Sequence, residues 1–216
     1  NRRVVVFYMD STLIETEVID ELAEFAGVGQ AVKDITYKAM SGEIDFEQSL
    51  RERVLLLKDL PISVLETVAN KLPITKGAYK LLKTLRMLGY KTAIISGGFS
   101  FFADKLRTEL GIDYVFGNTL EVSNGKLTGY MTGEIIDGER KAKLLRELSA
   151  KEGLNSEQVI AVGDGANDIE MIKKAGLGVS YNGKKVLEKE ANIHFKTTNL
   201  LGLLYAQGYS DNQIIS

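Results

Sequence analysis

The 216-residue sequence predicts an α/β protein: a Rossmann-like parallel sheet core with a helical cap inserted after the first strand and a small β-hairpin flap. Short apolar, β-branched runs alternate with segments of helical period, as in parallel sheets that are covered on both faces. Residues 15–70 break this alternation, because they contain amphipathic helical windows and no strand pattern. The segment 118–137 breaks it again, with alternating residues on both sides of an Asn-Gly turn signal.

Five apolar runs are predicted to form the strands of the core. They are residues 2–9, 91–97, 158–164, 176–181 and 191–195. Helices are expected between them at residues 78–88, at 100–110 ending on Gly111, and at 141–151 ending on Gly153.

The helical insertion has recognisable borders. Gly27, Gly42 and Pro61 separate its amphipathic windows, and Pro73 disfavours a helical conformation at Leu72, which makes this position a plausible hinge. We therefore expect residues 1–14 and 74–216 to form the α/β core and residues 15–73 to form a cap subdomain that opens and closes.

Composition excludes several classes of protein. The formal net charge is -2, so no nucleic-acid partner is indicated, and no apolar stretch has the length of a bilayer span. The chain has no cysteine, which rules out disulfides and thiolate metal sites and fits a reducing, cytoplasmic location. The oligomeric state is left open.

The chemistry is expected at the carboxyl ends of the strands, where ligands bind in open α/β sheets. Three carboxylates would meet there, and like charges at close range call for a cation such as Mg²⁺. Because Mg²⁺ fills its remaining positions with water and phosphate oxygens, a phosphate-containing ligand is expected. The residues that follow these strands are Asp10, Ser11 and Thr12; Ser96, Gly97 and Gly98; and Asp164, Asn167 and Asp168.

A phosphate would also find positive and polar partners. The Ser96-Gly97-Gly98 turn offers backbone N–H groups and a hydroxyl at the start of a helix. Lys141 opens a later helix and supplies the charge that a transferring phosphoryl group needs.

These motifs resemble the haloacid dehalogenase superfamily of phosphohydrolases and, within it, the phosphoserine phosphatase family. The four signatures occur in order as "YMDST" at 8–12, "SGGF" at 96–99, Lys141 in "ERKAK" and "GDGAND" at 163–168. The helical insertion follows the first motif, as in the family, so the resemblance covers essentially the whole chain.

The resemblance implies a substrate and a set of roles. O-phospho-L-serine would be hydrolysed to serine and phosphate, the last step of serine biosynthesis, with Mg²⁺ held by Asp10, Asp164 and Asp168. The remaining roles are Glu17 on the substrate ammonium, Arg53 on its carboxylate, Met40 and Phe46 as an apolar wall, and Ser96, Gly97, Gly98, Lys141 and Asn167 on the phosphate.

One residue departs from the family pattern. The family uses two aspartates after the first strand, one as the nucleophile that forms an aspartyl-phosphate and one as the acid and base. Asp10 holds the second position, whereas Tyr8 stands at the first, where a phenol is a poor nucleophile and a poor Mg²⁺ ligand. Three explanations remain open: a substituted copy of a working enzyme, a natural pseudophosphatase that binds a ligand or partner, and a phosphotyrosyl-enzyme.

Simpler interpretations compete for single residues. An isolated Asp-Ser-Thr would be a helix cap, and Glu17, Arg53 and Lys141 could be solvated helix surface. Arg51 is expected to be plain surface charge, and His194 a structural, partly buried ring. A phosphatase or phosphotransferase for another small phosphomonoester is the rival within the superfamily. Whether Asp168 binds the metal or holds Lys141 is left undecided.

Overall fold

A computed structural model describes residues 3–196 and 199–215, and seven strands in these residues form one sheet. The spatial order is β4-β3-β2-β1-β5-β6-β7, parallel throughout except for β4. The strands are β1 (Val4–Phe7), β2 (Lys91–Phe99), β3 (Tyr114–Ser123), β4 (Lys126–Thr132), β5 (Val159–Gly163), β6 (Leu177–Tyr181) and β7 (Ile193–Phe195). All five predicted core strands are confirmed. The structure also shows that the first residues of β3 pair in parallel with β2, which the sequence did not predict.

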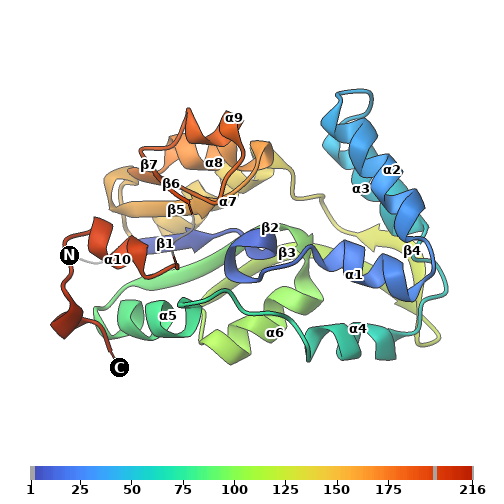
Figure 1. Cartoon of the computed structure of the whole chain (residues 1–216), viewed down its shortest axis with the longest axis horizontal. Coiled ribbons are helices and arrows are strands. Elements are labelled where there is room, and N and C mark those ends of the chain that lie inside the picture. The colour runs from blue at the N-terminus through green and yellow to red at the C-terminus, as the bar shows by residue number, and fades with distance from the viewer. Residues whose placement is uncertain (1–2, 197–198, 216) are drawn as a thin grey trace.

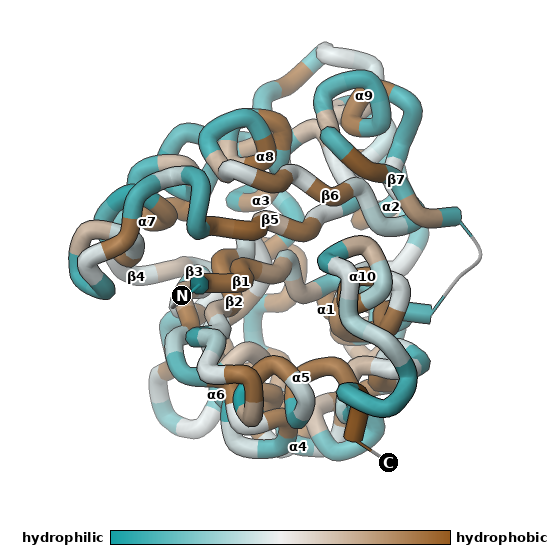
Figure 2. Tube along the Cα trace, turned by 90° about the vertical axis from the view of Figure 1, so that its left-hand side faces the viewer, coloured by the Kyte–Doolittle hydropathy of each residue, from teal (hydrophilic) through white to brown (hydrophobic). Residues whose placement is uncertain are grey.

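Two layers of helices cover the sheet, and β1 shows why both of its faces are apolar. Val4 and Val6 pack in the cluster that contains α7 and α8, whereas Val5 and Phe7 pack against α5 and α6. Figure 2 shows the apolar strands between these layers. One layer contains α7 (Gly138–Lys151), α8 (Ile169–Lys174) and α9 (Lys185–Glu188), and the other contains α5 (Ala78–Met87), α6 (Ser100–Leu110) and α10 (Gly202–Ala206).

The predicted helices agree with the structure except at one end. The helices α5 and α6 have the expected bounds to within a residue. The helix α7 begins at Gly138 and not at residue 141, because the Asp137 side chain caps it by accepting a 2.8 Å hydrogen bond from the Arg140 backbone N–H. Lys141 therefore lies within the first turn of α7.

The insertion forms four helices, one for each predicted window: α1 (Val18–Phe25), α2 (Gly29–Met40), α3 (Phe46–Leu55) and α4 (Ile62–Ala69). We call them the cap helices. Figure 1 shows α2 and α3 projecting at one end of the sheet, far from the two chain ends. The division into a core of 1–14 and 74–216 and a cap of 15–73 remains a prediction.

The two chain segments that lead into and out of the cap helices run side by side. The Glu15 N–H donates to the Pro73 carbonyl at 2.8 Å, and the Thr75 N–H donates to the Leu13 carbonyl at 2.9 Å. Ile14 and Ile74 form an antiparallel bridge between these bonds. The predicted hinge at Pro73 is thus paired with residues 13–15 in a short two-stranded ribbon.

The predicted hairpin is present and also touches the cap. Asn124 and Gly125 form its turn with φ values of 52° and 74°, the left-handed conformation that an Asn-Gly turn requires. Three backbone hydrogen bonds of 2.9 Å join residues 59–62 of the cap to 125–127 of the hairpin. The hairpin therefore contacts the cap through main chain as well as side chains.

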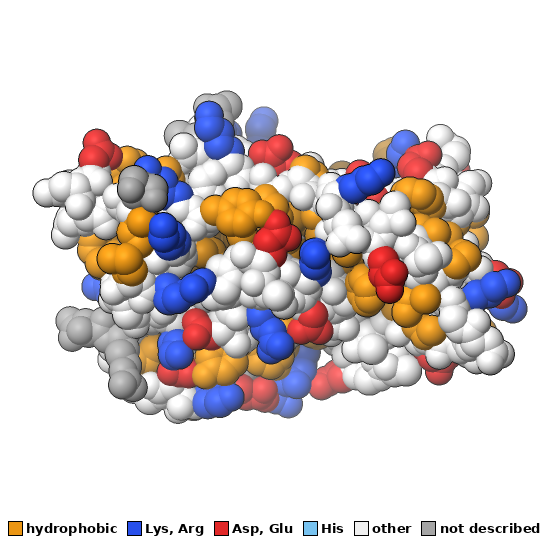
Figure 3. Space-filling view, turned by 90° about the horizontal axis from the view of Figure 1, so that it is seen from below, with side chains coloured by type: hydrophobic (Ala, Val, Ile, Leu, Met, Phe, Trp, Pro, Cys, Tyr) orange, Lys and Arg blue, Asp and Glu red, His pale blue; other side chains and the backbone are white. Residues whose placement is uncertain are grey.

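The surface is mixed in charge. On the face formed by α4, α5 and α6, basic and acidic side chains are interspersed (Figure 3). In the described part of the chain, no helix is both long enough and apolar enough to cross a membrane.

Candidate active site

A cavity of about 940 Å³ lies between the carboxyl ends of the strands and the cap helices. This volume is within the usual range of small-molecule sites. Of the residues predicted from sequence, its walls contain Tyr8, Asp10, Glu17, Met40, Phe46, Arg53, Gly97, Gly98, Asp164 and Asn167. Ser96, Lys141 and Asp168 lie behind this wall and are fully buried.

An irregular turn over Met9–Leu13 places the first acidic side chain. Ser11 has a φ of 57°, which reverses the chain direction within this turn. Asp10 then accepts a 2.8 Å hydrogen bond from the N–H of Val18, the first residue of α1. The Ser11 hydroxyl donates to Glu17 at 2.7 Å. Asp10 thus serves a helix that starts eight residues later and does not open one of its own, which disfavours the simple capping interpretation.

Tyr8 lies at the base of the cavity with its ring beneath a lysine. The side chain is only 8% exposed, and the Lys141 ammonium is 4.1 Å from the ring centroid, a cation–π distance. Burial, with a further contribution from Asp10, raises the pKa of Tyr8 well above 10. The phenol is therefore neutral across the physiological range and is a weak nucleophile.

Lys141 and Asp168 form a fully buried ion pair of 2.8 Å. The other carboxylate oxygen of Asp168 accepts from the backbone N–H groups of Asp164 and Gly165, at 3.1 and 3.2 Å. Both oxygens are occupied, so the structure favours the role of holding Lys141 over that of direct metal ligand. The assignment of Asp168 to the metal ligands stays a prediction.

Two acidic side chains keep a carboxylate oxygen that could meet a cation: Asp10, whose Oδ1 alone accepts from Val18, and Asp164. Burial, followed by the charge of Glu17, raises the pKa of Asp10 to about 7. Burial, followed by the charge of Asp168, raises the pKa of Asp164 to about 7, and Asp164 Oδ1 is buried without a hydrogen-bond partner. An unpaired, desolvated carboxylate oxygen beside a second carboxylate is a site that a divalent cation would stabilise.

The site therefore offers two carboxylates to Mg²⁺, and Mg²⁺ is commonly bound by one or two carboxylates of a protein. No ready-made group of three His, Cys, Asp or Glu side chains is found in the residues that the structure describes. Tyr8 occupies the place from which a third acidic ligand would come in the predicted family pattern.

Ser96, Gly97 and Gly98, predicted as a turn after the strand, lie in the last, irregular part of β2, which we call the glycine turn, and approach their neighbours too closely for larger residues. A Cβ atom on Gly97 would lie 2.8 Å from the ring of Phe46, and one on Gly98 would lie 2.5 Å from Asp10. The Gly98 N–H donates to the Ser96 hydroxyl oxygen at 2.9 Å. Because that oxygen accepts, the hydroxyl proton of Ser96 is available to a ligand.

The cap side of the cavity carries the residues expected to read the substrate. Arg53 and Phe46 face the cavity from α3, and the Arg53 guanidinium donates to the Ser49 carbonyl at 3.2 Å. Burial raises the pKa of Glu17 and lowers that of Arg53. Met40 lines the cavity but is 68% exposed, so in this structure it leaves the site open.

Two residues assigned to structural roles are placed as follows. Arg51 is exposed and forms a 2.7 Å ion pair with Glu47 on the same helix, as expected for surface charge. His194 is exposed on the edge strand β7, so the prediction of a partly buried ring is wrong. An edge strand buries only part of its surface, which the apolar neighbours in the sequence do not reveal.

The structure adds three residues to the site. Ser49 lines the cavity from α3, and its hydroxyl is buried without a partner. Its position between Phe46 and Arg53, three and four residues away on one helix face, would have identified it. Lys184 follows β6 at the carboxyl edge, where the same strand-end argument applies. Asn118 is a buried polar residue in β3, an unusual place for asparagine.

Comparison with known proteins places this arrangement among phosphohydrolases. Residues 3–176 match the haloacid dehalogenase-like hydrolase family. A phosphoserine phosphatase of Archaeoglobus fulgidus is 52% identical over 202 residues, which is 94% of this chain and 59% of that protein. A phosphoserine phosphatase of Methanocaldococcus jannaschii is 45% identical over 203 residues, 94% of this chain and 96% of that protein. The chain thus spans less than two thirds of the first relative and nearly all of the second.

Solved structures give the same result. A structure described as a substrate-bound phosphoserine phosphatase complex has a TM-score of 0.90 and 44% identity, covering 95% of this chain and 98% of that one. A phospho-aspartyl intermediate analogue of phosphoserine phosphatase has the same score and identity and covers 95% of this chain and 99% of that one. The similarity therefore extends over both the sheet and the cap helices.

Proposed function

Because this chain belongs to the haloacid dehalogenase-like hydrolases, in the phosphoserine phosphatase family, we propose that its cavity binds O-phospho-L-serine and that Tyr8 silences hydrolysis. The observation that carries this proposal is the burial of Tyr8 beneath Lys141, in a site whose other family residues are all present. The proposal rests on the family pattern for the role of each residue and on the geometry for their proximity.

The phosphate would bind at the base of the cavity. Lys141 and the Ser96 hydroxyl supply a positive charge and a donor, and the Gly98 N–H, which donates to the Ser96 oxygen, orients that hydroxyl. Asn167 would orient the phosphate from the opposite side. When bound by Asp10 and Asp164, Mg²⁺ would neutralise charge on the phosphate oxygens.

The amino acid part of the substrate would face the cap helices. Glu17 offers a carboxylate to the ammonium group, and Arg53 offers two parallel N–H donors to the carboxylate. Phe46 would cover the ester bond and limit the access of water. Phosphoserine presents an anion, a cation and a second anion, and the cavity wall provides a complement for each.

Asp10 would act as the acid and base of the reaction. In the family pattern, the carboxyl group at this position first gives a proton to the leaving serine oxygen and then takes one from water. The nucleophile, however, falls at position 8. Since the Tyr8 phenol stays neutral and its ring is in contact with Lys141, we expect hydrolysis to be lower than in the family by several orders of magnitude.

The first experiment compares phosphate release from L-phosphoserine with Mg²⁺ by this protein and by the Tyr8→Asp variant. Turnover by the variant alone, abolished by EDTA, would support the proposal. Equal activity of both proteins would show that position 8 is not the nucleophile, and inactivity of both would mean that the substrate or the reaction is wrong. The Tyr8→Phe variant serves as control, because it removes any phosphotyrosyl route without restoring a carboxylate.

A binding role without turnover is the second candidate, favoured by the intact cap side of the cavity beside an altered nucleophile. Calorimetry of the unchanged protein with L-phosphoserine and Mg²⁺ tests it. Binding by a protein whose Tyr8→Asp variant stays inactive would favour the binding role over an impaired enzyme.

The rival substrates are separated by a panel of small phosphomonoesters on the Tyr8→Asp variant. Phosphoserine should exceed phosphoethanolamine, which lacks the carboxylate, because Arg53 would lose its partner. A variant that prefers another ester, or that transfers phosphate to an added alcohol faster than to water, would point to a different member of the superfamily.

A further inference from the structure

Asn118 connects two parts of the site without lining the cavity itself. Its side chain is 2% exposed and comes from β3, next to the Ser96-Gly97-Gly98 turn. The Nδ2 group donates to the Gly97 carbonyl at 2.9 Å, and Oδ1 accepts from the Ile136 N–H at 2.9 Å. A carbonyl requires a donor and an N–H requires an acceptor, so these partners leave one orientation for the amide.

The hydrogen bond from Asn118 to the Gly97 carbonyl determines the orientation of the peptide group between Gly97 and Gly98. The Gly97 carbonyl and the Gly98 N–H belong to one planar peptide group and point in opposite directions. Asn118 holds the carbonyl end, and the Ser96 hydroxyl oxygen holds the N–H end at 2.9 Å. With both ends fixed, the Ser96 oxygen is committed as an acceptor and its proton is directed elsewhere, toward the bound anion.

The bond to Ile136 reaches the other anion-binding group. Ile136 precedes Asp137, the residue that caps α7, and Lys141 lies in the first turn of that helix. A Cβ atom on Gly97 would lie 3.2 Å from the Ile136 carbonyl, so the turn and the start of α7 are in direct contact. One buried side chain therefore joins the segment that carries Ser96 to the segment that carries Lys141.

We propose that Asn118 is a positioning residue for phosphate recognition: it sets the spacing of Ser96 and Lys141 without touching the substrate. The inference rests on the proposed function and deepens it, because it divides the site into two halves. The phosphate half depends on Asn118, whereas Glu17 and Arg53, which would read the amino acid half, belong to other segments.

The test uses the Tyr8→Asp protein with and without Asn118→Asp. Aspartate keeps the size of the side chain and the acceptor for Ile136 but cannot donate to Gly97. We expect affinity for inorganic phosphate in the presence of Mg²⁺ to fall about tenfold, while affinity for L-serine stays within about twofold. Calorimetry measures both ligands separately, and KM for phosphoserine should rise more than kcat falls.

The matched control is Asn192→Asp, since Asn192 accepts from the Gly178 N–H in a turn between β6 and β7 and does not line the cavity. It should leave both affinities unchanged. Equal weakening of phosphate and L-serine by Asn118→Asp, or a loss of stability with phosphate affinity intact, would overturn the positioning role. Asn118→Ser, which is shorter and uncharged, checks that the result does not come from an added charge.

The two proposals fail in different ways. If the Tyr8→Asp protein binds phosphate but does not hydrolyse phosphoserine, the proposed function is wrong. The affinities with and without Asn118→Asp then still test the positioning role of Asn118. If it binds no phosphate at all, the inference on Asn118 fails as well.

Discussion

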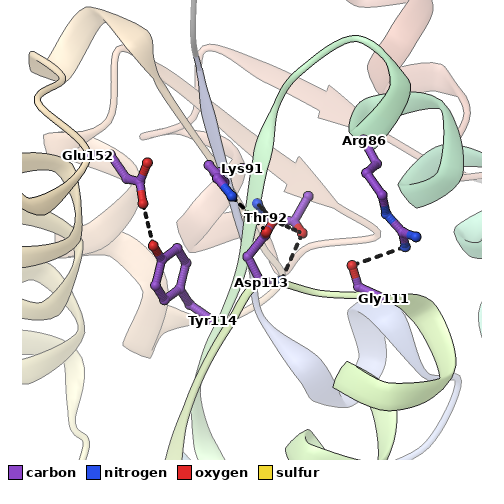
Figure 4. A network of polar contacts seen from close by, with 7 residues as sticks. All are labelled: Arg86, Lys91, Thr92, Gly111, Asp113, Tyr114 and Glu152. Atoms are coloured by element: carbon purple, nitrogen blue, oxygen red, sulfur yellow. Dashed lines mark hydrogen bonds and ion pairs between the residues drawn. The ribbon is translucent and has the colours of Figure 1, made fainter.

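The two ends of the sheet use polar side chains in opposite ways. At the amino ends, Asp113 accepts hydrogen bonds from the Thr92 N–H at 2.9 Å and from the Lys91 ammonium at 3.1 Å (Figure 4). Tyr114 donates to Glu152 beside them. Beyond the carboxyl ends, buried oxygens of Thr12, Asp164 and Ser180 have no hydrogen-bond partner in the part of the chain that the structure describes, and the same holds for Ser49 on α3 and Thr75 before α5.

The difference separates groups that stabilise the fold from groups that await a ligand. A buried polar atom without a partner lowers stability by about 1–3 kcal/mol, so several of them near one cavity are expensive. At the amino ends the polar side chains are paired: buried Thr92 bonds to Asp113, which also forms a partly exposed ion pair with Lys91. Polar groups that the fold leaves unsatisfied therefore mark the carboxyl end as the functional one.

The largest contrast between the two ends should appear in catalysis. In the Tyr8→Asp background, Asp10→Asn should reduce kcat by about 10²–10⁴-fold, because the amide can neither give nor take the proton. Asp113→Asn, the same change at the amino end, should leave kcat unchanged. Steady-state phosphate release measures both, and a similar loss from the two variants would remove the distinction.

Breaking the buried ion pair tests whether the carboxyl end also holds the fold together. Lys141→Met should lower the free energy of unfolding by about 3–5 kcal/mol, because Asp168 would remain buried without its cation. Urea unfolding gives the value. The double variant Lys141→Met with Asp168→Asn should recover part of the loss, because the amide carries no charge and its oxygen can still accept from the Asp164 and Gly165 N–H groups. A double variant no more stable than the single one would contradict this account.

Stability without metal should depend on pH at the carboxyl end. The pKa values of Asp10 and Asp164 are raised to about 7, so between pH 5 and 7 the folded state binds protons that the unfolded state has released. The free energy of unfolding in EDTA should therefore fall as the pH rises from 5 to 8, by about 2–3 kcal/mol for each of the two carboxyl groups. Mg²⁺ should reverse this trend by binding the ionised carboxylates.

Urea titrations at pH 5 and pH 8, with EDTA or with Mg²⁺, measure the effect. The variant that carries both Asp10→Asn and Asp164→Asn should show a flatter profile in EDTA. If the free energy of unfolding of the unchanged protein rose with pH in EDTA, this would contradict the raised pKa values of Asp10 and Asp164.

The smallest effect is expected at the amino end. Asp113→Ala should lower stability by about 1–2 kcal/mol, since it removes the partner of Thr92 and a partly exposed ion pair with Lys91. Hydrolysis by the Tyr8→Asp protein should be unaffected. Thermal unfolding and phosphate release on the same preparation give both values, and a marked loss of activity would mean that the two ends are coupled.

Much of this arrangement follows from local patterns in the sequence. Apolar runs without alternation indicate strands covered on both faces, and the Asn124-Gly125 dipeptide indicates a hairpin turn. The rule that ligands bind beyond the carboxyl ends of parallel strands is enough to predict that Asp10, Ser96 and Asp164 come together.

Pairings between distant segments could not be predicted in this way. Nothing near Asn118 in sequence reveals that it holds Gly97 and Ile136, and the partner of Asp168 depends on how α7 packs against residues 166–168 and α8. The exposure of His194 likewise depends on which strand becomes the edge of the sheet. These features depend on tertiary packing, which cannot be predicted from the local preferences of the residues.

The main-chain bonds between residues 59–62 and 125–127 have a consequence for protein engineering. A chimera that exchanges only residues 15–73 with a relative would set the relative's main chain against this chain's hairpin, so the three bonds would form only if the foreign segment keeps the same register. The natural unit of exchange is the cap together with the hairpin, so crossovers belong in the 13–15 and 73–75 ribbon and on the far side of β4.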